Sequence, residues 1–206
     1  TVISLFFPTS PQVRKSNRAD RSWPSPGWIH ARAEGMDMID RVNRRLCEIL
    51  ESEGYLALSP VRSERFAARE EEEGRVYTSN WSERHVAYIC GLGTFGLSKG
   101  LITRRGVAGR FTSILTNLSL APDVRPYTGL YEYCSLCGAC ARNCPAGAIS
   151  VETGKDHVRC ARFVNTTIER YNPPGTPARR NKRYGCGKCQ VKVPCEIGPC
   201  KAKQAP

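Results

Sequence analysis

The stretch CSLCGACARNCPAGAI, residues 134–149, places four cysteines within eleven positions and follows the last of them with proline. The whole chain has 206 residues and eleven cysteines. Because eleven is odd, a complete set of disulfides would leave one thiol over, and gaps of two residues are tighter than bridges between separate elements need. We therefore expect these thiols to bind metal in a reducing cytoplasm.

The spacing of this stretch points to iron and sulfur. Cys134-x2-Cys137-x2-Cys140-x3-Cys144-Pro145 is the run of bacterial two-cluster ferredoxins, in which three cysteines bind one [4Fe-4S] cube and the fourth binds the other. Short gaps let a curled backbone aim three thiolates at one cube while its amide N–H groups point at the sulfides. Zinc is the alternative, but a zinc ribbon needs only two C-x2-C pairs and no cysteine before proline.

Five later cysteines extend the set to nine candidates for eight ligand positions: Cys160, Cys186, Cys189, Cys195 and Cys200. Crossed ligation assigns the second cluster to Cys144, Cys160, Cys186 and Cys189. The first cluster takes Cys134, Cys137, Cys140 and one late cysteine. We favour Cys195, which lies nearer the turn at Cys189, and Cys200 stays the alternative. The two early cysteines, Cys47 and Cys90, are predicted to be buried and apolar in character.

The cysteines also suggest where the chain divides, since nine of the eleven lie at or after Cys134. We predict an α+β protein with a cofactor- or partner-binding domain over residues 1–130 and a two-[4Fe-4S] ferredoxin-like domain over 131–206. The apolar run over residues 1–7 is far shorter than the roughly 20 residues of a membrane span, so we expect a cytoplasmic protein with no membrane contact.

Apolar periodicity, turn residues and capping signals predict the main elements. Strands are expected over residues 1–7, 55–59 and 110–118. Helices are expected over 34–54, 64–73 and 156–171, together with one from Asn80 to Ile89, and short helices should follow each cysteine group. Residues 8–35 and 172–182 are expected to be loops.

The chain is strongly basic, with a formal net charge of +12. Two loaded clusters would contribute about −2 each and leave it basic. The excess is greatest over residues 178–206, where eight lysines and arginines face one glutamate. Such a run is either a solvated face or a contact for an acidic partner, such as a flavodoxin, a ferredoxin or an RNA backbone.

Several motifs together resemble one enzyme family. They are the run from Cys134, Cys160 sixteen residues after Cys144, Tyr184-Gly185-Cys186-x2-Cys189-Gln190, Glu83-Arg84, and Gly91-Leu92-Gly93-x2-Gly96. In combination they resemble epoxyqueuosine reductase, a cobalamin-dependent iron–sulfur enzyme, and more distantly the reductive dehalogenases. The glycine motif follows a predicted helix instead of a strand, which argues against a Rossmann dinucleotide site. A tight turn without a ligand is its other interpretation.

The resemblance implies a nitroreductase-like α/β domain that holds base-off cobalamin, followed by the ferredoxin-like domain. The implied cofactor-binding residues are Gly91, Gly93, Gly96, Leu101, Ile102 and Arg110. The chain has no D-x-H-x-x-G motif, so cobalamin would bind without an axial histidine.

The chain departs from this family in two places. Val193 stands where the family has its eighth cysteine ligand, so a later cysteine must replace it. The family's acidic proton donor aligns at Tyr77, and no aspartate lies between Tyr77 and Glu83. A phenol is the proton donor in reductive dehalogenases, which gives Tyr77 that role by resemblance; an ordinary structural tyrosine is the alternative. These departures argue against a tRNA substrate.

Two functions follow. The first is an oxidoreductase in which two [4Fe-4S] clusters, reduced by a small redox protein, relay single electrons to a corrinoid or other cofactor at the first domain. The second is a ferredoxin-like electron carrier or reductase subunit whose first domain holds no cofactor. A third interpretation, nucleic-acid binding, rests on the basic stretch at residues 178–206.

Overall fold

The centre of the fold is a three-stranded antiparallel sheet. The computed structural model describes residues 1–69, 78–175 and 183–200. The sheet has the order β1-β7-β2, with strands β1 (Val2–Pro8), β7 (Gly109–Thr116) and β2 (Ala57–Leu58). Val2 pairs with Leu115 at one end of the β1–β7 ladder, and Pro8 pairs with Gly109 at the other. The strands predicted over 1–7, 55–59 and 110–118 are confirmed.

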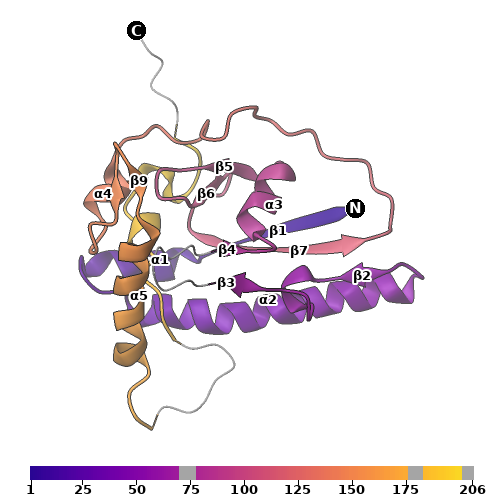
Figure 1. The fold of residues 1–206 in the computed structure, drawn as a ribbon, viewed down its shortest axis with the longest axis horizontal. Helices are drawn as coiled ribbons and strands as arrows, with labels where there is room; N and C mark the ends of the chain where they lie inside the picture. The colour runs from indigo at the N-terminus through magenta and orange to yellow at the C-terminus, as the bar shows by residue number, and fades with distance from the viewer. Residues whose placement is uncertain (70–77, 176–182, 201–206) are drawn as a thin grey trace.

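Helices cover the sheet from two sides. Figure 1 shows the long helix α2 (Pro26–Ser52) running beneath the strands, with α3 (Glu83–Ile89) above them. The predicted loop over residues 8–35 is wrong, because α1 (Pro11–Ala19) and the first turns of α2 fill it. The N-cap serines of α1 and α2, Ser10 and Ser25, each accept a hydrogen bond from the backbone N–H three residues later. In both helices proline follows the serine, in the first turn. Both features are standard helix start signals.

Two further expectations about the first half are corrected. The described part of the charged helix predicted over 64–73 forms a turn and then β3 (Ala68–Arg69), which pairs with β4 (Thr78–Ser79). The helix expected from Asn80 begins at Glu83. Asn80 cannot cap it, because its side chain accepts from the Ala67 N–H at 3.0 Å and donates to the Arg65 carbonyl at 2.6 Å.

The cysteine-rich half is built from short elements. They are the hairpin β8 (Ile149–Ser150) and β9 (Gly154–Lys155), helices α4 (Ala139–Arg142) and α5 (His157–Tyr171), and the 3-10 turns η2 (Lys188–Gln190) and η3 (Pro194–Glu196). The helix expected over 156–171 is thus confirmed. The short helices expected after each cysteine group are instead found within the groups, because α4 contains Cys140 and η2 contains Cys189, and a β-hairpin follows Cys144. Asp156 caps α5 by accepting the Arg159 N–H at 2.9 Å.

The late loops pack directly on the first half of the chain. Val191 shares a buried cluster with Trp28 and Ala108. Val193 shares another buried cluster with Ile102 and Val107. Ile102 belongs to β6 (Leu101–Thr103), which pairs with β5 (Gly93–Phe95). The remaining 3-10 turn, η1 (Pro60–Arg62), follows β2. The hydrophobic core therefore joins the sheet, α2 and the cysteine loops.

One member of the basic stretch is buried and not solvated. Lys188 is 4% exposed, and its ammonium donates to the carbonyl oxygens of Asn17 and Asp20, each at 2.7 Å. Most other basic residues of that stretch lie outside the described residues. Among the helices that are described, none has both the length and the apolar character required to cross a bilayer.

Candidate iron–sulfur and cofactor sites

Five cysteines line one narrow cavity, which we call thiol cavity one. They are Cys134, Cys137, Cys140, Cys195 and Cys200. The Leu97 N–H points at the Cys134 sulfur at 3.4 Å, and the Cys200 N–H donates to the Tyr133 carbonyl at 3.1 Å. Cys137 is exposed. The structure thus brings three cysteines of the first run together with both late candidates.

The two late candidates occupy different parts of thiol cavity one. Cys195 packs with Cys134 and Cys140 against the apolar cluster around Val193, and the Val107 N–H donates to its carbonyl at 3.0 Å. Burial raises the pKa of Cys195, and nearby Cys200 raises it further. Cys200 is absent from this apolar cluster. The placement agrees with the preference for Cys195, while the ligand itself stays a prediction.

Four other cysteines line a larger space of about 470 Å³, which we call thiol cavity two. They are Cys144, Cys160, Cys186 and Cys189. Burial, followed by the neighbouring Cys189, Cys160 and Cys144, raises the pKa of Cys186 to about 12. The Ala148 N–H points at the Cys144 sulfur at 3.3 Å. This grouping is the crossed set expected for a second cluster, with Cys144 taken from the first run.

A glycine lets the late loop close over thiol cavity two. Gly187 lies between Cys186 and Cys189 with a φ of +71°. A Cβ at this position would lie 2.0 Å from Cε2 of Trp28, so both the backbone conformation and the close approach require glycine. Trp28 is 5% exposed and belongs to α2. The second thiol group is therefore fixed against the first half of the chain.

The donor chemistry of both thiol cavities suits [4Fe-4S] clusters. Burial raises the pKa of Cys140 to about 11, so its thiol is neutral near pH 7 until a metal replaces the proton. Amide N–H groups already point at one sulfur in each cavity. Within the described ranges, no three His, Cys, Asp or Glu side chains are arranged to hold a single metal ion. A [4Fe-4S] cluster does not need thiols that converge on a single metal ion, because each thiolate binds a separate iron of the cube.

A third space of about 710 Å³, the arginine cavity, lies beside thiol cavity two. The two share five lining residues: Arg32, Arg84, Arg110, Tyr184 and Gln190. The Arg32 guanidinium stacks 3.6 Å from the centroid of the Tyr184 ring. Burial first, and then Arg32, lower the pKa of Arg110 to about 10, which still leaves it protonated near pH 7. With Glu83 as the acidic lining residue, the arginine cavity favours an anionic group.

The cofactor residues implied by the resemblance do not form one surface. Leu101 and Arg110 line the arginine cavity, whereas Gly96 and Ile102 line thiol cavity one. Gly93 is in β5, where a Cβ would lie 2.0 Å from the Ile102 carbonyl oxygen, so its packing alone requires glycine. Gly91 faces the backbone of Arg125. Tyr77 lies outside the described residues.

Arg32 was missed in the sequence because it fell inside the predicted loop over 8–35, whereas Met36 lay in the helix predicted over 34–54 and was not assigned to a site. They are four residues apart on α2 and both line the arginine cavity. The start signal Ser25-Pro26 would have extended the predicted helix to include Arg32.

Comparison with known proteins agrees with the thiol geometry. Residues 130–150 match the 4Fe-4S binding domain family, so a domain of this kind is present in the chain. A tetrachloroethene reductive dehalogenase from Desulfitobacterium hafniense is 44% identical over 68 residues, 32% of this chain and 12% of that protein. An epoxyqueuosine reductase from Listeria monocytogenes is 28% identical over 124 residues, 60% of this chain and 32% of that protein.

Solved structures show the same fold in longer proteins. A selenomethionine-labelled epoxyqueuosine reductase matches 97% of this chain and 52% of its own with a TM-score of 0.54 at 20% identity. A reductive dehalogenase whose structure suggests a mechanism for B12-dependent dehalogenation matches 82% of this chain and 23% of its own, with a TM-score of 0.54 at 18% identity. The chain matches 12% of the length of the Desulfitobacterium hafniense dehalogenase and 32% of the length of the Listeria monocytogenes reductase, so it spans about a third or less of either protein.

Proposed function

We propose that this iron–sulfur, oxidoreductase-like relative of epoxyqueuosine reductases and reductive dehalogenases relays single electrons through two [4Fe-4S] clusters to a cofactor in the arginine cavity. One observation carries the proposal: thiol cavity two and the arginine cavity share a wall of five side chains. A group held by the thiols would therefore lie next to a group held by the arginines. Electron transfer from one to the other needs no movement of the chain.

The cysteines divide between the clusters as the two cavities group them. Cys134, Cys137, Cys140 and Cys195 hold the first cluster in this proposal. Cys144, Cys160, Cys186 and Cys189 hold the second. Bound clusters supply one-electron chemistry. The surrounding chain orients the thiols, excludes water through the packing of Trp28 and Val193, and directs N–H groups at the sulfurs.

The residues of the arginine cavity suit a corrinoid of the cobalamin type. Cobalamin carries a phosphate in its nucleotide loop, and a guanidinium is the preferred partner of phosphate. Arg32, Arg84 and Arg110 would bind and orient such an anionic group. The described residues that line this cavity include no histidine, so in this proposal none of them would supply an axial imidazole. The B12-dependent chemistry named for the solved dehalogenase supports the same choice of cofactor.

Cofactor retention tests this function. The chain is reconstituted anaerobically with iron, sulfide and hydroxocobalamin, then separated from free cofactor, and its visible spectrum is recorded. We expect about one corrinoid per chain in the wild type and a substantial loss in Arg110→Met. Arg44→Met, an exposed change on α2, is the matched control and should retain the corrinoid. A wild-type corrinoid that elutes free would contradict the proposal.

A second function, an electron carrier without its own cofactor, is favoured by the scattered positions of the glycines. Gly91, Gly93 and Gly96 do not line the arginine cavity, although the resemblance implied that they would hold the cofactor. In this case the clusters form, no corrinoid is retained, and the reduced chain passes electrons to a partner. The same spectrum separates the two functions, because the cluster absorption persists while the corrinoid band is absent.

A further inference from the structure

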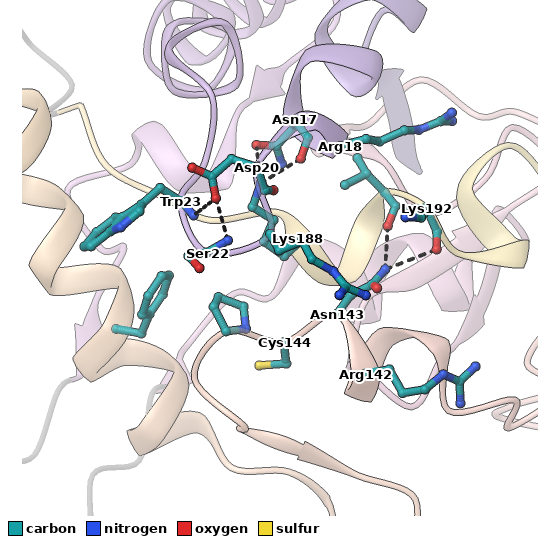
Figure 2. A pocket seen from close by; sticks show the side chains of 14 residues that line it. Asn17, Arg18, Asp20, Ser22, Trp23, Arg142, Asn143, Cys144, Lys188 and Lys192 are labelled. Atoms are coloured by element: carbon teal, nitrogen blue, oxygen red, sulfur yellow. Dashed lines mark hydrogen bonds between the residues drawn. The ribbon is translucent and has the colours of Figure 1, made fainter.

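A fourth space of about 430 Å³, the Trp23 cavity, opens on another side of thiol cavity two. Figure 2 shows Trp23, Asp20 and Lys188 lining it above Cys144. The Trp23 cavity and thiol cavity two share four lining residues, namely Cys144, Pro145, Phe163 and Lys188. The Trp23 cavity shares none with the arginine cavity. Thiol cavity two therefore borders the proposed cofactor space and also a separate opening.

The lining of the Trp23 cavity is strongly positive. It contains Arg18, Arg21, Arg142, Lys188 and Lys192 against a single acidic residue, Asp20. Arg18 forms an ion pair with buried Glu196. Arg21, Arg142 and Lys192 are exposed, and none of these side chains forms an ion pair with another described residue. Arg142 donates to the Cys137 carbonyl at 3.1 Å. The Asp20 carboxylate accepts hydrogen bonds from the backbone N–H groups of Ser22 and Trp23 at 2.6 and 2.9 Å, and these bonds hold the turn between α1 and α2.

The aromatic part of the Trp23 cavity lining is already packed. The Trp23 ring lies 5.6 Å from that of Phe163, and the Arg170 guanidinium lies 4.5 Å from the Trp23 centroid. A nucleic-acid base would need a free aromatic face for stacking, and here it would compete with these two contacts. Aromatic side chains and exposed cations in one lining instead complement a protein that presents an apolar edge within an acidic surface.

We infer that the Trp23 cavity is the docking surface for an acidic redox protein that donates electrons to this chain. The inference rests on the proposed function, because only an electron-relaying chain needs such a donor. The shared wall with Cys144 places a docked donor one layer of side chains from thiol cavity two. Each encounter transfers one electron and no atoms, so the donor leaves oxidised by one electron.

Charge reversal at two of these exposed cations, Arg21 and Lys192, tests the docking surface. The probe is an oxidised bacterial flavodoxin, titrated calorimetrically into the reconstituted full chain at low and at high salt. We expect Arg21→Glu/Lys192→Glu to weaken binding at low salt by about tenfold or more and to flatten its salt dependence. The control, Arg41→Glu/Arg44→Glu, makes the same charge change at exposed positions of α2 and should alter binding less than about twofold.

Iron content and bleaching by dithionite are measured on every protein, so that the failure of docking is distinguishable from the failure of the relay. A wild-type chain that bleaches normally but does not bind flavodoxin would overturn the docking inference alone. Equal weakening by both double variants would overturn it by assigning the effect to net charge. Loss of binding to a tRNA stem loop, with flavodoxin binding unchanged in Arg21→Glu/Lys192→Glu, would overturn it in favour of RNA.

Discussion

The two thiol cavities differ in where their cysteines come from. Thiol cavity one takes three of its five cysteines from one short stretch, residues 134–140, and Cys137 is exposed. Thiol cavity two takes Cys144 from the end of that run, Cys160 from α5, and Cys186 and Cys189 from a loop packed on Trp28. Thiol cavity one therefore joins two separate segments of the chain, whereas thiol cavity two joins three.

This difference has an energetic consequence. When a metal centre joins segments that are far apart in the chain, the free energy of metal binding becomes free energy of folding. Each further segment that a centre joins closes another loop and removes more entropy from the unfolded chain. Loss of the group in thiol cavity two should therefore destabilise the whole protein more than loss of the group in thiol cavity one. Thiol cavity two also borders both the arginine cavity and the Trp23 cavity, so damage there should interrupt the relay.

The largest effect is expected for Cys144→Ser. This change removes one thiol from thiol cavity two, and we expect about four of about eight irons to be lost, together with a marked fall in thermal stability. Iron analysis with low-temperature EPR of the reduced protein measures both the count and which signal remains. Cys47→Ser, outside both cavities, is the control and should keep its iron. Preferential loss of the cluster at Cys134 would reverse the crossed assignment.

The next effect separates the two late cysteines of thiol cavity one. Cys195→Ala should remove or degrade the cluster held by Cys134, Cys137 and Cys140, because Cys195 packs with two of them at the apolar cluster. Cys200→Ala, the matched variant, should retain about eight irons. Both are compared by iron content and by EPR of the reduced proteins. Full iron in Cys195→Ala beside a damaged Cys200→Ala would make Cys200 the ligand.

A smaller effect is expected from the backbone beside thiol cavity two. Gly187→Ala places a methyl group against Trp28 at positive φ, and we expect a loss of about 3 kcal/mol in the free energy of unfolding. Gly154→Ala is the control, because it has a φ of +78° but no atom within 4 Å of the added methyl group. It should cost about 1 kcal/mol. Equal losses in chemical denaturation under argon would show that the contact with Trp28 contributes nothing.

The smallest effect concerns Glu83 in the arginine cavity. Burial raises the pKa of Glu83 above its ordinary value, and the neighbouring Ser113 offsets this in part. The protonated form is therefore favoured by folding, and this stabilising contribution is lost as the pH rises through the raised pKa. We expect Glu83→Gln to raise the melting temperature by about 1–3 °C at pH 8, with the gain shrinking toward pH 5.5.

The control for Glu83→Gln is Glu51→Gln, at an exposed position on α2. It should leave the melting temperature unchanged across the same range. A gain in Glu83→Gln that grows as the pH falls would contradict burial as the cause.

The sequence predicts local features of this protein better than the way distant parts meet. The alternation of apolar and polar residues was enough to predict strand β7. The spacing of the cysteines was enough to predict which thiols would lie together in each of the two thiol cavities. Prolines in residues 8–35 were interpreted as loop signals, although Ser10-Pro11 and Ser25-Pro26 begin helices. The arginine cavity depends on Arg32, Arg84 and Arg110 arriving from separate elements, which no local pattern records.

The central claim is that the chain holds two [4Fe-4S] clusters, and its most direct test is elemental. The protein is reconstituted anaerobically, freed of unbound metal, and analysed for iron, acid-labile sulfide and zinc per chain. We predict about eight irons and about eight sulfides per chain with little zinc. About four irons per chain, or one zinc per chain in place of iron, would contradict the account.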